Sequence, residues 1–544
     1  MATYDFQLLL KHLLEHGVSW VPEQEIVYGE RFRYRYEDMY QRVLKLAAGL
    51  KHLGVYQGTK VGVIEWDSHR YLEMYFGIPG SGAILHTINP NLAQEHVLQT
   101  IQHAEDEILI FHEDFLQRVE RIRDQLPNIK TFIVITEDFA SAGNPSADYT
   151  YEQLLELNPP LPELPEFSED TQATLSYTTG TTGQPKGVYF SHRQLVLHTF
   201  AAWGSIAMFG NDGGLSKHDV YMPLTPMFHV HAWGVPYVAT VYGLKQVYPG
   251  RYDYDRILSL MKQERVSFSH CVPTILQNVL EVAESSGQDL TGWKVIVGGA
   301  RLTNGLANAA QKLGVEITAG YGLSESCPFL TLASLRTHME KDWSEEDQMD
   351  VRVKTGFPMP LVKYRVVGSD GEDVPQDGEH TGEIVLRSPW LTEGYYKDPE
   401  GSEQLWSGGW MHTGDVANVD QNGYIQIVDR MKDIIKSGGE WIVSLELENI
   451  LSLHEDVLEA GVIGIPDKKW GERPLAIIAS KEGSQEGLNA DALQSHLASF
   501  VSEGQITKWA VPERFVFVDQ LPKTSVGKID KKELRRKYSS LSEE

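Results

Sequence analysis

The amino-acid sequence predicts an α/β protein. We expect a large N-terminal domain of two α/β subdomains and a small β-barrel-like subdomain, followed by a small mobile α+β C-terminal domain. The chain has 544 residues, which is too long for a single hydrophobic core. Short β-rich runs alternate with helical patterns through about the first 330 residues, and this alternation is typical of open α/β sheets. The clearest runs cover 60–66, 107–112, 131–136, 294–299 and 315–320.

The pattern changes twice further along the chain. After about residue 350, alternating apolar residues are separated by Gly, Asp and Pro turns, which indicates an all-β unit. A short charged stretch at 430–433 then precedes a last segment with strand and helix signals of its own. We therefore predict a large domain at 1–429 with a β-rich subdomain at about 335–428, a hinge linker at 430–434 and a small domain at 435–544.

Two other regions have distinct compositions. Residues 1–17 lack a basic start, and Lys11 and His12 interrupt their apolar positions, so they predict an amphipathic helix rather than a signal peptide. The region 141–170 is rich in Pro, Ser and acidic residues, which predicts an exposed loop inside the large domain.

The charge balance argues against a nucleic-acid partner. Lys and Arg total 48 and Asp and Glu total 75, so the formal net charge is −27, and such a surface repels phosphate backbones. Two cysteines, Cys271 and Cys327, do not make a disulfide framework. The sequence has no run of about 18 apolar residues that could span a membrane. We therefore expect a cytoplasmic location, and the sequence leaves a homodimer and peripheral membrane contact open.

The strongest local signal is a glycine-rich loop within 175–192. Its glycines let backbone N–H groups approach a ligand, its threonines add hydroxyl donors and its lysine adds a charge. Together they predict a phosphate cradle between two strands. The loop lacks the Gly-Lys-[ST] ending of a Walker A motif. The candidate phosphate-binding residues are Thr178, Thr179, Gly180, Thr181, Thr182, Gly183 and Lys186.

The loop sequence YTTGTTGQPKG resembles the signature of the adenylate-forming, or AMP-binding, superfamily. Four further motifs follow in the family's order: the Gly-Tyr-Gly-Leu-Ser-Glu element at 320–325, Gly414-Asp415, Asp429-Arg430 and the Pro-Lys-Thr-Ser-Val-Gly-Lys string that ends at Lys528. The resemblance covers nearly the whole chain and is greatest for the fatty acyl-CoA synthetase branch. It implies activation of a carboxylic acid by ATP to an acyl-adenylate with release of pyrophosphate, then transfer of the acyl group to CoA.

The resemblance also implies roles for individual residues. Tyr321 would stack on adenine, beside Gly298, Gly299 and Ala300, and Asp415 and Arg430 would contact the ribose. Ser324 stands where the family usually has Thr and still offers a hydroxyl to the α-phosphate. The remaining nucleotide-binding positions are Gly320 and Gly322, and the Mg²⁺ ligands are Glu325 and Thr181.

The catalytic and CoA-binding positions lie near and beyond the linker. Lys528 would contact the carboxylate and the α-phosphate, and Lys432 matches the hinge about which the small domain rotates between the two steps. Lys436, Ser437, Gly438 and Gly439 would face the pantetheine arm of CoA, and Glu440 is a candidate for steering or deprotonating the thiol.

The acyl pocket is predicted within 226–243, where histidines and aromatic residues meet an apolar helical pattern. By the resemblance, His229 lies near the acyl carboxylate, and Trp233, with His231 nearby, matches a tryptophan that gates a fatty-acyl tunnel. A medium- or long-chain fatty acid is the first choice of substrate. Short branched or methylthio acids, a non-CoA acceptor, and a non-catalytic nucleotide-binding protein are the alternatives, the last disfavoured because Lys528, Glu325 and the threonine loop are all present.

Overall fold

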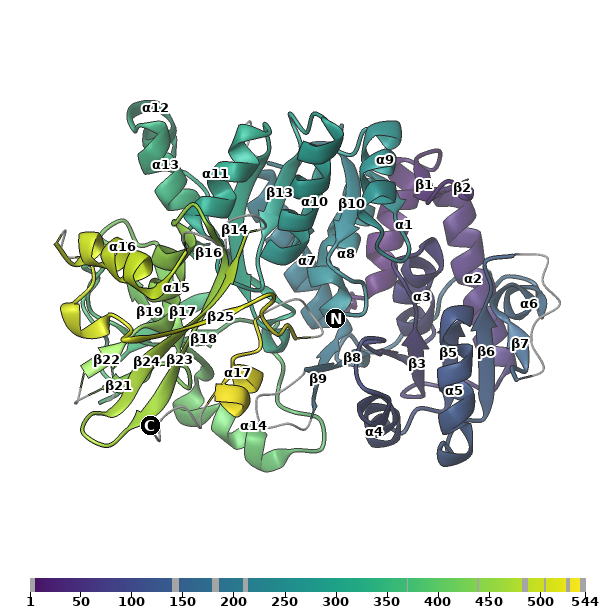
Figure 1. Ribbon diagram of the computed structural model, residues 1–544. Coiled ribbons are helices and arrows are strands. Elements are labelled where there is room, and N and C mark those ends of the chain that lie inside the picture. The colour runs from purple at the N-terminus through teal and green to yellow at the C-terminus, as the bar shows by residue number, and fades with distance from the viewer. Residues whose placement is uncertain are drawn as a thin grey trace.

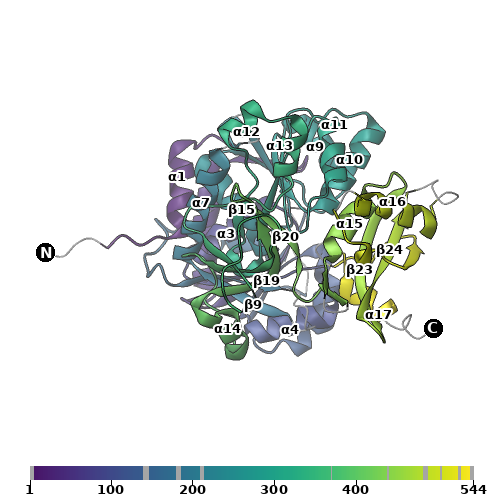
Figure 2. The same cartoon turned by 90° about the vertical axis from the view of Figure 1, so that its left-hand side faces the viewer.

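The computed structural model describes residues 5–138, 146–178, 185–208, 214–368, 370–437, 440–481, 488–502, 505–524 and 529–538. The described chain forms four sheets. Two of them lie in the larger body with most of the helices, and the C-terminal unit lies at one side of that body (Figure 1; Figure 2).

The first sheet contains three of the predicted β runs. Its strand order is β7-β6-β5-β3-β4-β8-β9, and all neighbours are parallel except β8 and β9. Helices α4 (Gln94–Ala104) and α5 (Leu116–Ile122) cover one face of it through a shared apolar cluster. The strands are β3 (Lys60–Ile64), β4 (Ile84–Thr87), β5 (Ile108–His112), β6 (Thr131–Ile135), β7 (Tyr149–Thr150), β8 (Gln172–Thr178) and β9 (Lys186–Ser191).

The second sheet has nine strands in the order β16-β15-β14-β13-β12-β10-β11-β1-β2. Its central strands are parallel, and its two edges are antiparallel. The strands are β1 (Glu25–Tyr28), β2 (Phe32–Arg35), β10 (Val220–Leu224), β11 (Lys245–Tyr248), β12 (Phe268–Cys271), β13 (Lys294–Val297), β14 (Glu316–Gly322), β15 (Phe329–Leu332) and β16 (Phe357–Pro358). Helices α9 (Tyr254–Glu264), α10 (Pro273–Ser286) and α11 (Asn304–Lys312) cover one face.

The main core lies between these two sheets. One apolar cluster includes Ile110 of the first sheet and Ile26 of the second, together with side chains of six α-helices. The helices are α1 (Leu10–Trp20), α2 (Tyr36–His52), α3 (His69–Gly80), α6 (Tyr151–Glu156), α7 (His192–Ala207) and α8 (Val235–Tyr242). All the residues of α3 are buried, as expected of a helix in the middle of a layered protein. In the part of the chain that is described, no helix has both the length and the apolar character needed to cross a membrane.

The prediction of an exposed loop over 141–170 is wrong in its middle. Residues 149–150 form β7, and α6 (Tyr151–Glu156) follows it. Thr150 and Gln153 form a reciprocal capping box, which satisfies two backbone donors at the start of the helix. Tyr151 and Leu154 are buried against the main core, so apolar contacts outweigh the polar composition of the flanking residues.

The β-rich region forms an antiparallel sheet in the order β17-β18-β19-β20. Its strands are β17 (Lys363–Val367), β18 (Gly382–Arg387), β19 (Met411–Val419) and β20 (Ile425–Arg430), and α14 (Pro399–Leu405) lies between β18 and β19 in the sequence. In the described residues β17 and β20 do not pair with each other, so the predicted barrel-like unit is an open sheet. Helices α12 (Thr337–Asp342) and α13 (Glu345–Arg352) precede it.

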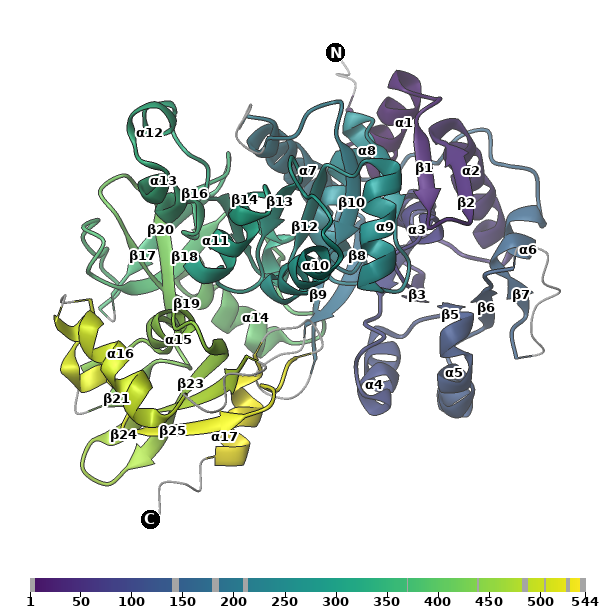
Figure 3. The same ribbon diagram turned by 45° about the horizontal axis from the view of Figure 1, so that its top comes forward.

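The C-terminal unit has a sheet and core of its own, as predicted for a small α+β domain. The path β22-β21-β24-β23 is antiparallel, and β25 joins β24 in parallel. The elements are β21 (Ile435–Ser437), β22 (Glu440–Ile442), α15 (Ser444–Ser452), β23 (Val457–Asp467), β24 (Gly471–Ser480), α16 (Ala490–Ser502), β25 (Arg514–Val518) and α17 (Lys531–Tyr538). Two apolar clusters pack against this sheet, one with side chains of α15 and α16 and the other with Leu534 of α17. Figure 3 shows these helices beside the sheet.

Candidate functional site

A buried carboxylate connects the end of the nine-stranded sheet to the β-rich sheet. Asp415, in β19, is 3% exposed and accepts a hydrogen bond from the Tyr321 hydroxyl at 2.7 Å. Its other carboxylate oxygen lies 3.1 Å from Nε of Arg430, which is its direct partner in the β19–β20 ladder. The Asp415 carboxylate raises the pKa of the Arg430 guanidinium. Three residues predicted to bind adenosine therefore form one connected group.

Glycines allow Tyr321 to reach this position. Strand β14 pairs in parallel with β13 up to Ala319 and then in antiparallel fashion with β15 from Gly320. A Cβ atom on Gly322 would lie 1.8 Å from the carbonyl oxygen of Pro328, so no other residue fits there without a shift of the backbone. A Cβ on Gly320 would lie 3.1 Å from Ile296 and Phe329. The predicted Gly-Tyr-Gly motif thus marks two close approaches on either side of the tyrosine.

Glu325 and Lys186 lie on either side of one tyrosine that the motifs did not indicate. The Tyr395 hydroxyl donates to Oε1 of Glu325 at 2.8 Å, and Nζ of Lys186 lies 4.3 Å from the centre of the Tyr395 ring. Lys186 is also 3.9 Å from the Asp398 carboxylate. Burial and the Glu325 carboxylate raise the pKa of Tyr395. The candidate metal ligand and the lysine of the glycine-rich loop are therefore close neighbours.

The glycine-rich loop connects two paired strands, as the sequence predicts. Thr178 at the end of β8 pairs with Lys186 at the start of β9. Both residues are half-buried. The predicted phosphate-binding residues Thr179, Gly180, Thr181, Thr182 and Gly183 lie outside the described residues.

Trp233 lies against Gly298, one of the residues predicted to lie beside adenine. A Cβ atom on Gly298 would lie 2.8 Å from the Gly320 carbonyl oxygen and 3.2 Å from the Trp233 indole, so the indole packs directly on Gly298. The indole is 4% exposed, and its ring centre is 5.2 Å from that of His270. The next residues are Gly299, with φ of +77°, and the exposed Ala300. Trp233 is thus packed between Gly298 and His270.

The backbone around Trp233 is strained. Val230, His231, Ala232, Trp233 and Gly234 have φ values of 43°, 58°, 46°, 59° and 76°, which is a continuous left-handed run. Each non-glycine residue in this conformation costs about 1–2 kcal/mol. Strain of this kind persists only where the surrounding structure holds it.

Asp67 and Tyr75 hold the segment just before the strained run. Asp67, buried after β3, accepts the N–H of Met227 at 2.8 Å and the hydroxyl of Tyr252 at 2.7 Å. The Tyr75 hydroxyl donates to the Met227 carbonyl oxygen. Burial raises the pKa of Asp67 to about 7 even though both donors oppose the rise. This link joins the two large sheets, and no motif identified it beforehand.

The two predicted histidines have different surroundings. His229 is half-buried at the start of the strained run, and its N–H donates to the Pro226 carbonyl oxygen. His231 is fully buried among Tyr75, Phe190 and Tyr237. In the described structure neither ring nitrogen of His231 has a hydrogen-bond partner. Burial lowers the pKa of His231 to about 3, so the imidazole is neutral at pH 7.

The linker connects β20 to β21. Lys432 is exposed there, whereas the carboxylate of the next residue, Asp433, lies 2.5 Å from the Arg535 guanidinium of α17. Lys436 is exposed and Ser437 is buried in β21. Glu440 begins β22, where its backbone pairs with Ser437. The remaining predicted residues of this region, Gly438, Gly439 and Lys528, lie outside the described residues.

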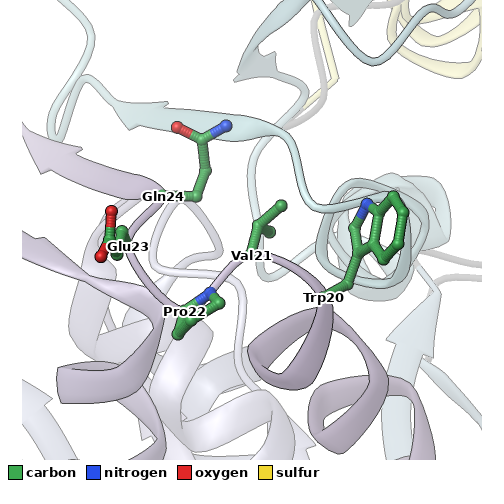
Figure 4. A pocket seen from close by; sticks show the side chains of 5 residues that line it. All are labelled: Trp20, Val21, Pro22, Glu23 and Gln24. Carbon is green, nitrogen blue, oxygen red and sulfur yellow. The ribbon is translucent and has the colours of Figure 1, made fainter.

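The pocket in Figure 4 is a separate feature. It is a surface hollow at the end of α1, lined by residues 20–24, and none of the predicted site residues lines it. Among the described residues no group of three His, Cys, Asp or Glu side chains is arranged to hold a metal ion. Glu325 can supply a single carboxylate oxygen, which suits a Mg²⁺ ion that keeps its other ligands on water and substrate phosphates.

Two family models match the chain. The model described as AMP-binding enzyme matches residues 14–396, and the model described as AMP-binding enzyme C-terminal domain matches residues 446–528.

The similar proteins cover almost the whole chain. A long-chain-fatty-acid–CoA ligase of Thermus thermophilus is 40% identical, over 98% of this chain and 96% of that protein. A 3-methylmercaptopropionyl-CoA ligase of Ruegeria lacuscaerulensis is 37% identical, over 98% and 97%. The crystal structure of the anthranilate CoA ligase AuaEII with anthranoyl-AMP has a TM-score of 0.85 at 24% identity and covers 99% of both chains, which supports the fold.

We predict that Gly322→Ala weakens ATP binding. The new methyl group must displace the Pro328 carbonyl or the strand itself, and either movement shifts Tyr321. Gly204→Ala is the matched control, because its Cβ meets nothing within 4 Å and alanine in a helix is more favourable than glycine by about 1 kcal/mol. Calorimetric titration with ATP measures the binding affinity, and thermal unfolding measures the stability of each variant. Equal ATP affinity in Gly322→Ala and the control would contradict this interpretation.

Proposed function

The chain belongs to the AMP-binding enzyme family, and we propose that it is an AMP-forming acid–thiol ligase that converts a fatty acid to its CoA thioester with ATP and Mg²⁺. The single observation that carries the proposal is the connected group of Tyr321, Asp415 and Arg430 beside Glu325. Two neighbouring acyl-CoA ligases at 40% and 37% identity support CoA as the acceptor.

The first step joins the acid to the nucleotide. A carboxylate oxygen attacks the α-phosphorus of ATP, a P–O bond forms, the bond to the β-phosphate breaks, and pyrophosphate leaves. Because the attacking acid and the phosphates are both negative, the protein must position them and neutralise their charge. Mg²⁺ enters with ATP as part of the substrate, and Glu325 is the described residue suited to hold it.

The proposed roles follow from the geometry and from the family motif together. Tyr321, Asp415 and Arg430 bind adenosine, with Gly298–Ala300 and Gly320–Gly322 shaping the space around the base. Ser324 and the loop 178–186 face the phosphates. Lys528, at the end of the second family match, is proposed to bring its ammonium group to the reacting carboxylate and the α-phosphate. His229 lies on the acid side of the same place.

The second step transfers the acyl group to sulfur. The CoA thiol loses its proton, its sulfur attacks the carbonyl carbon, the C–O bond to AMP breaks, and AMP leaves. We propose that the small domain, 435–544, rotates about Lys432 in the linker 430–434 between the two steps. The short connection between β20 and β21 supports this division of the chain. Lys436–Gly439 would then line the path of pantetheine, with Glu440 near the thiol.

The acid is proposed to be apolar and of medium or long chain length. The burial of Trp233 and His231 among aromatic neighbours, with His231 kept neutral by burial, supports the proposal, because a pocket for an apolar chain needs uncharged walls. A methylthio-alkanoate is the alternative, because one of the similar proteins is a 3-methylmercaptopropionyl-CoA ligase.

A cytoplasmic location is part of the proposal, and two free, buried cysteines support it. A homodimer and peripheral membrane contact are proposed as alternatives for the exposed Trp20, Phe200 and Met208 side chains.

The direct experiment is AMP release with ATP and Mg²⁺ across straight-chain acids from acetate to stearate, with and without CoA. We expect sustained release that requires CoA and peaks at one chain length, because the apolar pocket has a fixed depth. Release that is equal with and without CoA would contradict the acceptor, and no release with any acid would contradict the proposed substrate class.

Lys528→Ala is expected to slow adenylation by about 10²- to 10³-fold, the usual effect of removing a group that stabilises developing charge. Thioester formation from supplied acyl-adenylate should be spared, because that step does not form the phosphate anhydride. Rapid-quench assays of the two half-reactions provide the measurement. Similar losses in both would rule out the assigned role.

Trp233→Ala is expected to move the preferred chain length, with little effect on the KM for ATP. Each buried methylene contributes about 0.8 kcal/mol, so an opened pocket wall changes the ranking of neighbouring acids by roughly fourfold per carbon. The profile of kcat/KM against chain length reports the change, with Phe200→Ala, an exposed aromatic residue, as control. An unchanged profile in Trp233→Ala would count against the gate.

A further inference from the structure

A polar link crosses the linker between the two domains. Asp429, the penultimate residue of β20, is 1% exposed. Its Oδ2 accepts the backbone N–H of Ser444 at 2.6 Å and the Ser444 hydroxyl at 2.5 Å. Ser444 is the first residue of α15, which packs beside β20 (Figure 2). Lys531, at the start of α17, donates from Nζ to the Ser444 hydroxyl oxygen at 2.6 Å.

The same link continues into the nucleotide end of the site. The other oxygen of Asp429 accepts the N–H of Arg430 at 2.7 Å. The Arg430 side chain pairs with Asp415, which accepts from Tyr321. A chain of hydrogen bonds and one ion pair therefore runs from the adenine-stacking position to the first residue of α17, over side chains that lie far apart in the sequence.

Lys531 carries the charge that makes this link stable. Its side chain is 11% exposed, and its Nζ lies 2.9 Å from the carboxylate of Glu448. Glu448 in turn accepts the N–H of Val462 at 2.7 Å. Burial alone would lower the pKa of Lys531, but Glu448, Asp429 and Asp433 raise it above the ordinary value. Arg301 also lies near Glu448 and Asp429, but Lys531 is the cation that contacts both Glu448 and the Ser444 hydroxyl, so its loss leaves Glu448 without its direct partner.

The link joins residues on the two sides of the proposed hinge. Asp429 precedes Lys432, the proposed hinge, whereas Ser444 and Lys531 both follow it. Rotation of the small domain about Lys432 therefore separates the Asp429 carboxylate from the Ser444 hydroxyl. The contact between Lys531 and Glu448 lies within the small domain and moves with it.

We infer that Lys531 is a positioning residue that, through Ser444, locks the small domain onto Asp429 for the first half-reaction and is released for the second. The inference rests on the proposed two-step function. Lys528, to which the first step is assigned, precedes Lys531 by three positions. The link from Lys531 through Ser444 to Asp429 thus limits the movement of the segment that carries Lys528. The link has no role in the second step, after the small domain has rotated.

The test compares Lys531→Gln, Lys531→Arg and Ser444→Ala with wild type in both half-reactions. Lys532→Gln is the matched control, because this exposed lysine is the next residue of the same helix. Acid-dependent exchange of pyrophosphate into ATP measures adenylation. Thioester formation from supplied acyl-adenylate and CoA measures the second step. Trypsin cleavage at 430–436, followed by mass spectrometry without substrates, measures access to the linker.

Lys531→Gln should reduce exchange by roughly 5- to 150-fold, the range of a coupling between two sites, and leave thioester formation close to wild type. Lys531→Arg should recover most of the loss, Ser444→Ala should show a smaller loss of the same kind, and trypsin should cut the linker faster in Lys531→Gln than in Lys532→Gln. Any other pattern of the half-reactions overturns the inference. If no acid stimulates pyrophosphate exchange in the wild-type protein, the proposed function fails. In that case the lock is tested by trypsin alone, and equal cleavage rates in Lys531→Gln and Lys532→Gln would overturn it.

Discussion

The carboxylate of Asp415 is the contact on which the site depends. It is buried, it receives Tyr321 from the nine-stranded sheet and Arg430 from the neighbouring strand, and it fixes the three side chains relative to each other. The Arg430 side chain is 46% exposed, so water screens its ion pair with Asp415. The ion pair therefore adds little to the stability of the fold, and its main effect is to hold the two side chains in place. The hydrogen bond from the Tyr321 hydroxyl to Asp415 is partly buried, and it connects the β-rich sheet to the end of β14.

The proposed acid side of the site depends on a different constraint. The left-handed run that carries Trp233 is unfavourable by itself, and it follows a segment that Asp67 and Tyr75 hold from both sides of the Met227 peptide. Because Asp67 follows β3 of the first sheet and Met227 follows β10 of the second, the relative position of the two sheets fixes the segment that leads to Trp233. Helix α3 is buried between the sheets, and its close packing holds the contacts of Asp67 and Tyr75 with Met227 away from water.

Sequence patterns predicted the parts of the fold that are local. Continuous apolar runs such as 60–66 and 131–136 became parallel strands, since strands covered on both faces have this composition. The Gly-Tyr-Gly motif was recognised by its resemblance to the family, and its physical reason is that only glycine fits beside Pro328. The contacts of Asp67 with Met227 and of Tyr395 with Glu325 were not predictable, because they join residues far apart in the sequence through single hydrogen bonds. The strained run at 230–234 has one glycine and no other local signal for a positive φ.

The most direct test of the account is acid-dependent exchange of labelled pyrophosphate into ATP in the absence of CoA. If the Asp415 group binds adenosine for activation of a carboxylate, a preferred fatty acid will drive rapid exchange, and Asp415→Asn will weaken it chiefly through a higher KM for ATP. Exchange that no acid stimulates, in a protein that still binds ATP, would contradict the claim that this site forms an acyl-adenylate.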